Sequence, residues 1–311
     1  MSAKYRTNLP QLNGKTFLTD GGIETTLIFH DGLDLPLFSA FVLLDGGDEL
    51  AALKAYFERY AAIARENETG FILESPTWRA SHGWGAQLGY SVTQIADYNR
   101  RAIDLMQTIR DAYETDATPM PISGCIGPQG DGYSPETMMS AEAAQAYHTH
   151  QVETFARTDA DMVTAITMTY AEEAIGITRA AQSAGMPVVI SFTVETDGKL
   201  PSGQPLHDTI MQVDAATNYG PVYYMINCAH PTHFEQVLTG AWVERIRGLR
   251  ANASTMSHAE LDEAEELDAG DPVDLGYRYN LLKDRLPNLT VLGGCCGTDH
   301  RHIEEIYRAY S

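Results

Sequence analysis

The sequence reads Leu289-Thr290-Val291-Leu292-Gly293-Gly294-Cys295-Cys296-Gly297-Thr298 near its C-terminal end. An apolar run typical of a buried strand thus ends on two glycines and two adjacent cysteines. A second apolar run, Val222-Tyr223-Tyr224-Met225-Ile226, ends on Asn227 and Cys228. Both runs are followed by segments with helical character. Because the carboxyl ends of parallel barrel strands meet on one face, the pattern predicts that three thiols converge there.

Eight β-like runs alternate with helical segments along the chain. The runs are Thr16–Asp20, Phe71–Ser75, Pro121–Cys125, Met162–Met168, Pro187–Thr193, Val222–Cys228, Ile246–Asn252 and Thr290–Cys296. The helical segments are Asp48–Glu66, a stretch after Ser91, one that opens at Ser140, Ala171–Ala184 and His302–Tyr310. This alternation predicts an α/β fold of right-handed βαβ units. Eight units predict a parallel eight-stranded (β/α)8 TIM-type barrel, with residues 1–311 as one domain, and an open doubly wound sheet is the alternative.

Two stretches have the composition of inserted loops. Gly124–Glu136 is rich in Gly, Pro and Asp, and Ala253–Pro272 is rich in acidic residues. A run of like charge is typical of a solvated surface, so we expect the second stretch to lie in solvent.

The composition excludes several classes of function. The 311 residues hold 21 Lys and Arg against 42 Asp and Glu, a net charge of −21, which argues against nucleic acid as a partner. No stretch is apolar enough to predict a membrane span, and the first residues lack the apolar core of a secretion signal. We therefore expect a cytoplasmic protein with reduced cysteines, which leaves metal binding or catalysis for them. The oligomeric state is not predicted.

Cys228, Cys295 and Cys296 predict a zinc site whose fourth position is open to substrate. Three thiolates give the zinc complex a net charge of −1, which makes it a poor activator of water. Such a site still suits the deprotonation of an incoming thiol. The chemistry that it favours is the attack of a thiol on a carbon electrophile.

Several segments share their pattern with one known family. They are Leu18–Leu27 (an opening DG-x-x-x-T motif), Thr77–Ser81 (T-[YF]-x-A-[SN]), Gly124–Gly130 (G-S-I-G-P-x-G), Ser191–Gly203 (S-F-x…D-G…L…G), Asn227–Cys228 (N-C) and Gly293–Ile303 (G-G-C-C-G-T-x-x-x-H-I). On these segments, nearly the whole chain resembles the homocysteine S-methyltransferase family of zinc-dependent (β/α)8 barrels. The resemblance implies that Cys228, Cys295 and Cys296 are the zinc ligands.

The resemblance also implies where the substrate binds. The residues concerned are Asp20, Gly21, Gly22, Thr167 and Asn227. The Asp20 carboxylate is expected to pair with the substrate ammonium, and Asn227 to orient its neighbouring ligand or the substrate. The family usually has a Glu that grips the amino group of homocysteine where this chain has Ile166, and Glu172 and Glu173 are candidates to replace it. Glu24 stands where the family has Gly.

Other residues near these motifs have ordinary interpretations as well as functional ones. Cys125, where the family has Ser, is predicted to be a packed thiol without a metal. His230 and His233 are expected at the surface or as helix caps, and His302 as structural support. Three aromatic residues are expected at the mouth of the barrel, where they would pack or face a cationic donor; they are Trp78, Trp84 and Tyr133.

The leading hypothesis is a zinc-dependent S-methyltransferase that acts on small molecules. The thiolate of homocysteine would take a methyl group from an onium donor and yield methionine. S-methylmethionine or S-adenosylmethionine is the favoured donor, and betaine is a less favoured candidate. One alternative keeps the zinc and changes the thiol acceptor, because Ile166 replaces the family's Glu. Another is a non-catalytic barrel that binds zinc or senses redox state through Cys295 and Cys296.

Overall fold

The computed structural model describes residues 3–135, 137–264 and 266–311. Glu136 and Glu265 lie outside these ranges, so each of the two predicted loops contains one residue that is not described.

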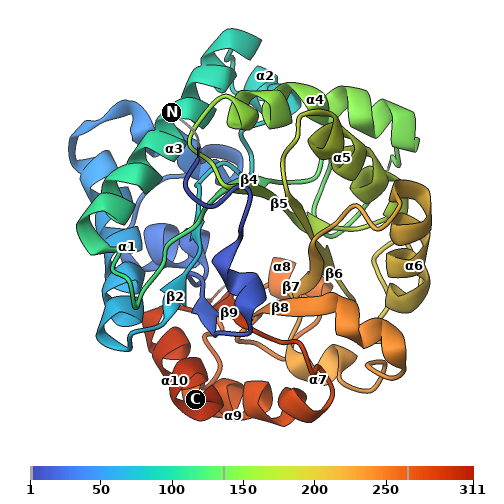
Figure 1. The fold of residues 1–311 in the computed structure, drawn as a ribbon. Coiled ribbons are helices and arrows are strands. Elements are labelled where there is room, and N and C mark those ends of the chain that lie inside the picture. The colour runs from blue at the N-terminus through green and yellow to red at the C-terminus, as the bar shows by residue number, and fades with distance from the viewer. Residues whose placement is uncertain (1–2, 136, 265) are drawn as a thin grey trace.

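Nine parallel strands in the described residues form a nearly closed barrel (Figure 1). The strands are β1 (Phe17–Leu18), β2 (Gly70–Phe71), β3 (Leu73–Glu74), β4 (Ile122–Ile126), β5 (Met162–Met168), β6 (Val188–Thr193), β7 (Tyr223–Asn227), β8 (Ile246–Ala251) and β9 (Val291–Gly294). Only Ile72 separates β2, which pairs with β1, from β3, which pairs with β4. These two are therefore halves of one barrel strand, and the predicted TIM-type barrel is confirmed.

Helices surround the strands (Figure 1). The α-helices are α1 (Gly47–Glu66), α2 (His82–Gln87), α3 (Val92–Tyr113), α4 (Ala141–Ala156), α5 (Ala171–Ser183), α6 (Leu206–Thr217), α7 (Pro231–Phe234), α8 (His258–Asp262), α9 (Pro272–Leu281) and α10 (His300–Tyr310). Short helices of other types are η1 (Pro10–Asn13), η2 (Thr25–His30), η3 (Pro36–Phe38), η4 (Ala40–Asp45), η5 (Ala241–Arg245) and η6 (Leu282–Asp284). In the described ranges, none of the helices combines the length and the apolar character needed to cross a bilayer.

Helix boundaries follow local signals in the sequence. Ser91 caps α3 through a capping box with Gln94, and Ser140 caps α4 by accepting from the Ala143 amide. These side chains satisfy backbone N–H groups that have no partner within the helix, and each fixes where its helix begins.

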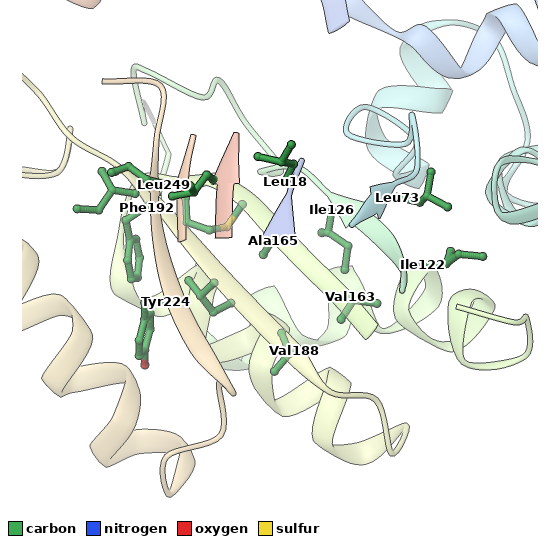
Figure 2. Packing of buried hydrophobic residues seen from close by; sticks show 14 of the residues in the cluster. Leu18, Leu73, Ile122, Ile126, Val163, Ala165, Val188, Phe192, Tyr224 and Leu249 are labelled. Carbon is green, nitrogen blue, oxygen red and sulfur yellow. The ribbon is translucent and has the colours of Figure 1, made fainter. Parts of the chain in front are cut away.

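Strand side chains alternate between two apolar clusters. Leu18, Val188 and Tyr224 belong to the larger cluster that the helices cover, whereas their neighbours Phe17, Val189 and Tyr223 belong to a smaller one with Leu9. Because successive strand residues point to opposite faces, the smaller cluster fills the barrel interior. Figure 2 shows the larger cluster, in which the rings of Phe192 and Tyr224 stack with centroids 6.0 Å apart. The strands thus pack against apolar side chains on both faces.

Candidate active site

Three cysteines meet at the carboxyl ends of β7 and β9. Their sulfur atoms all lie within 4.8 Å of one another, in a cluster of Cys228, Cys295 and Cys296. Strand β8 lies between β7 and β9 and accepts a hydrogen bond from each cysteine loop. The Cys228 amide donates to the Arg250 carbonyl (3.0 Å), and the Cys295 amide donates to the Ala251 carbonyl (2.8 Å). The parallel sheet thus joins residues that are 67 positions apart.

Cys228 and Cys295 form a disulfide in this structure, whereas the sequence analysis expected all cysteines to be reduced. Their Cα atoms are 5.3 Å apart, which lies within the usual range for a disulfide. The pair is also different from the Cys295–Cys296 pair considered in the redox-sensing alternative. The convergence of the two strand ends explains the pairing. It brings the backbones of Cys228 and Cys295 close enough for their side chains either to bind one metal or to bond to each other.

The reduced cluster fits a zinc ion. Zinc–sulfur bonds of about 2.3 Å in a tetrahedron place sulfur atoms ~3.8 Å apart. The three sulfurs lie within 4.8 Å of one another, and Cys228 and Cys295, which are bonded here, would separate to the zinc-site spacing after reduction. In the described residues, no His, Asp or Glu belongs to the cluster, so a fourth ligand would come from outside this set. Two-electron reduction of the disulfide is required before all three thiolates can bind a metal.

Close backbone packing holds the cysteine loop. A Cβ atom at Gly22 would lie only 2.6 Å from the Cys295 carbonyl oxygen, so only glycine fits there. The Gly22 amide donates to the Thr298 carbonyl (3.0 Å), and Gly297, with a φ of +78°, donates to the Thr25 hydroxyl (3.0 Å). Gly22 therefore positions the cysteine loop, in addition to lining the cavity described below.

Asn227, the last residue of β7, reaches past β6 to a bulge in β5. The register of β5 against β6 shifts between Ala165 and Met168, and Thr167 there has a φ of +66°. The Thr167 amide donates to the Asn227 Oδ1 atom (3.0 Å), and Asn227 Nδ2 donates to the Thr167 hydroxyl (2.9 Å). Thr167 Oγ1 lies 3.9 Å from the Cys228 sulfur. The amide of Asn227 thus orients Thr167 beside the cluster.

Asp20 follows β1 and is ion-paired inside the barrel. Its Oδ1 atom lies 2.9 Å from Nη2 of Arg250, and its Oδ2 atom accepts from the Tyr56 hydroxyl (2.8 Å). Arg250 also donates through Nε to the Gly294 carbonyl (3.1 Å), and Tyr56 donates to the Gly21 carbonyl (2.9 Å). The sequence analysis missed Arg250, because an arginine inside a strand has no motif of its own.

A cavity of about 460 Å³ opens beside the cysteines, which is large enough for a small molecule. Its acidic lining residues are Asp20, Glu24, Glu74, Asp131, Asp262, Glu266 and Asp268, and its arginines are Arg79 and Arg250. Gly21, Gly22, Thr167 and Ile166 line it as well. This excess of carboxyl groups favours a cationic ligand.

Glu172 and Glu173, the candidates to replace the family's Glu, do not line this cavity. Glu172 accepts from Gln212 (3.0 Å), and Glu173 accepts from the Gln129 amide (2.7 Å) and lies 2.9 Å from His148. Both belong to α5, whose first turn points them at neighbouring helices and loops rather than at the barrel axis.

Burial raises the pKa of Glu24 to about 7, partly opposed by its own backbone amide, and it raises the pKa of Glu74 to about 7, partly opposed by Arg250. Both groups are thus half-protonated near neutral pH. A cation bound in the cavity would favour their ionised forms.

Glu74→Gln is expected to weaken the pH dependence of stability. The pKa of Glu74 rises from 4.5 to about 7 on folding, so the stabilisation is complete below pH 4.5 and is lost as the pH rises through 7. The loss amounts to about 3 kcal/mol in the free energy of unfolding. Denaturant unfolding at pH 5 and pH 8 measures it in the wild type, in Glu74→Gln and in the exposed control Glu66→Gln. Equal pH dependence in the wild type and Glu74→Gln would refute this role.

The acidic stretch Ala253–Pro272 is not a purely solvated surface, contrary to the prediction. It contains α8, and Leu261, Asp262 and Asp268 line the cavity. His258 Nε2 lies 2.5 Å from the Cys228 carbonyl oxygen, and its Nδ1 lies 3.0 Å from Glu195. The segment therefore forms one wall of the site, and a charge count could not distinguish a wall from a solvated loop.

The remaining histidines have structural contacts. His230 caps α7 by accepting from the Thr232 amide, and His233 Nε2 lies 2.8 Å from the Thr255 carbonyl oxygen. His302 belongs to the capping box of α10 and its Nε2 lies 2.8 Å from the Ala269 carbonyl oxygen, so it ties the acidic segment to α10. The capping role of His230 and the supporting role of His302 are confirmed.

Cys125 lies in β4, and Tyr133 lies in the loop that follows this strand. Cys125 is a buried free thiol whose pKa is raised by burial and by the nearby Glu74, as expected of a packed thiol. Tyr133 lines the cavity, and its hydroxyl lies 3.4 Å from the Cys296 sulfur. Its ring also packs on that of His258, with centroids 4.4 Å apart. Together these residues close the site around the cysteines.

Solved structures with this fold include three of the homocysteine methyltransferase MmuM from Escherichia coli. The oxidized form is 20% identical with a TM-score of 0.73 and covers 96% of this chain and 97% of that one. The metallated form is 19% identical, with a TM-score of 0.69 and coverage of 95% and 96%. The apo form is 18% identical, with a TM-score of 0.64 and coverage of 97% and 98%. At this identity the likeness shows the fold.

No curated protein matches the chain in sequence. The sequence profile described as homocysteine S-methyltransferase, however, matches residues 17–310, which include every strand of the barrel and all three cysteines of the cluster. The chain is thus an S-methyltransferase enzyme, and it belongs to the homocysteine S-methyltransferase family.

Proposed function

We propose that this enzyme transfers a methyl group from an onium donor to the thiol of homocysteine, with zinc held by Cys228, Cys295 and Cys296. The observation that carries the proposal is the convergence of the three sulfur atoms within 4.8 Å at the edge of an acidic cavity. Family membership supports homocysteine as the acceptor, and a metallated form of the Escherichia coli enzyme supports a metal. Thiols that must stay reduced fit a cytoplasmic location.

When bound, zinc would lower the pKa of the acceptor thiol so that the sulfur is present as a thiolate at neutral pH. The residues of the chain supply the surroundings of that sulfur. The carboxyl groups of Glu24 and Asp131 attract a cationic donor, and Tyr133 and His258 cover the cluster. The cavity would align the thiolate with the methyl carbon, so that the new carbon–sulfur bond forms as the bond to the onium atom breaks.

The favoured donors are S-methylmethionine and S-adenosylmethionine, and betaine is the third candidate. All three present a positively charged sulfur or nitrogen with a methyl group. The acidic lining of the cavity supports this class, because it lowers the energy of a bound cation.

X-ray absorption at the zinc edge tests the proposed metal site. Reduced protein is expected to show three sulfur ligands and one lighter atom, and addition of homocysteine is expected to give four sulfur ligands. Methionine formation is then measured with each donor. An unchanged coordination shell together with no turnover would contradict the proposal.

Ile166 favours one alternative, in which another thiol is the acceptor. This apolar side chain lines the cavity at the position of the family's Glu. Rates with homocysteine and with a thiol that lacks the amino group separate the two cases. Faster turnover of the second thiol would establish the alternative.

A further inference from the structure

Arg79 is a buried cation at the edge of the cavity. It lies in the loop that follows β3, lines the cavity and is only 5% exposed. Its guanidinium lies between two indole rings, 4.0 Å from the centroid of Trp78 and 3.7 Å from that of Trp84. The two aromatic faces predicted at the mouth thus stack on a residue of the chain itself.

The hydrogen-bonding capacity of Arg79 is largely unused. Its Nη1 donates to the Gly130 carbonyl (3.1 Å), and its Nε is buried without a partner. In the ranges 3–135, 137–264 and 266–311, no carboxylate oxygen lies within 4.0 Å of its nitrogen atoms. A guanidinium has five N–H donors, and leaving the buried Nε–H of Arg79 unpaired is unfavourable. The arrangement is typical of a site completed by a ligand.

Arg250 provides a comparison within the same cavity. It is also buried and its Nη1 has no partner, but Asp20 lies 2.9 Å from its Nη2, and the Gly294 and Gly21 carbonyls accept from its Nε and Nη2. Burial lowers the pKa of Arg79 to about 10, partly offset by Asp131 and Glu24, so the group is still charged at neutral pH. Arg79 is therefore a permanent cation with free donors in a lining that is otherwise acidic.

These contacts indicate a zwitterionic ligand. The carboxyl groups of the lining favour a positive charge, while the planar guanidinium matches the two oxygens of a carboxylate. We propose that Arg79 binds the carboxylate of a substrate whose cationic group lies among the carboxyl groups of Glu24 and Asp131. This inference rests on the proposed function. Both the onium donor and the thiol acceptor carry a carboxylate, so the experiment has an arm for each.

Equilibrium binding to reduced, zinc-loaded protein tests the inference without turnover. Tryptophan fluorescence reports on binding, because Trp78 and Trp84 flank Arg79. The donor arm compares betaine with tetramethylammonium, and the acceptor arm compares homocysteine with 3-aminopropane-1-thiol. In one arm, Arg79→Gln is expected to lower the binding affinity for the ligand that carries a carboxylate about 30-fold or more. The affinity for the matching ligand without a carboxylate should stay unchanged. Arg79→Lys should restore part of the affinity, and the exposed Arg59→Gln on α1 should bind as the wild type does.

The arm that responds identifies the ligand that Arg79 holds. A wild type that binds both members of each pair equally, or not at all, would overturn the inference, as would an Arg79→Gln variant that keeps the preference. Circular dichroism and zinc content show whether the variants are folded. If the wild type binds carboxylates through Arg79 but forms no methionine, the proposed function fails and this inference stands.

Discussion

Cys295→Ala is expected to lose both zinc and methyl transfer. Cys295 supplies one of three sulfurs in the cluster and follows directly on β9. Since loss of a group that merely supports a metal ligand lowers metal affinity or activity about 10–100-fold, loss of a ligand itself should leave less than ~1% of the activity. Zinc content after gel filtration and the rate of methionine formation measure the two effects.

Cys125→Ser is the matched control for Cys295→Ala. Cys125 is the fourth cysteine of the chain and lies outside the cluster. This variant should retain zinc in the wild-type amount. If Cys295→Ala kept its zinc and its activity, the three-thiolate site would be wrong.

Arg250→Met is expected to cause the largest loss of stability. The arginine is 7% exposed and its partner Asp20 is 3% exposed, so the substitution leaves a buried carboxylate without its cation. Breaking a buried pair in this way costs about 3–5 kcal/mol in the free energy of unfolding. Denaturant unfolding curves of the wild type and the variant, fitted with the same two-state equation, measure the loss.

The control for Arg250→Met is Arg157→Met. Arg157 pairs with Glu153 on α4, and the two side chains are 78% and 51% exposed. Such surface pairs contribute about 0–1 kcal/mol. The double variant Arg250→Met with Asp20→Asn should recover part of the lost stability. Equal losses in Arg250→Met and Arg157→Met would show that the buried pair contributes no more than a surface pair.

The strands could be predicted from sequence because each is a short apolar run. Met162–Met168 was predicted with the observed bounds, and the other runs coincide with strands to within a few residues. The broken strand at Ile72 was not predicted, since β2 and β3 lie in one continuous apolar run. Helices α6 and α9 were missed as well.

The cysteine cluster was predicted because its residues sit at strand ends beside glycines. Contacts between distant segments were not. Nothing near Arg250 in the sequence indicates Asp20, which lies 230 positions away, and the acidic segment gave no sign that His258 would reach the Cys228 carbonyl. Arg79 was read only as part of a motif, because burial between two tryptophans becomes visible only in three dimensions.

The left-handed backbone at two residues of the site has a consequence for directed evolution. Thr167 has a φ of +66° and Cys228 a φ of +52°, where a side chain costs on the order of 1–3 kcal/mol that glycine avoids. Glycine would relieve this strain at both positions, although at Cys228 it would also remove the disulfide to Cys295. It would remove the hydroxyl beside the cluster and one of its three thiols, so a screen of this enzyme must score activity together with melting temperature.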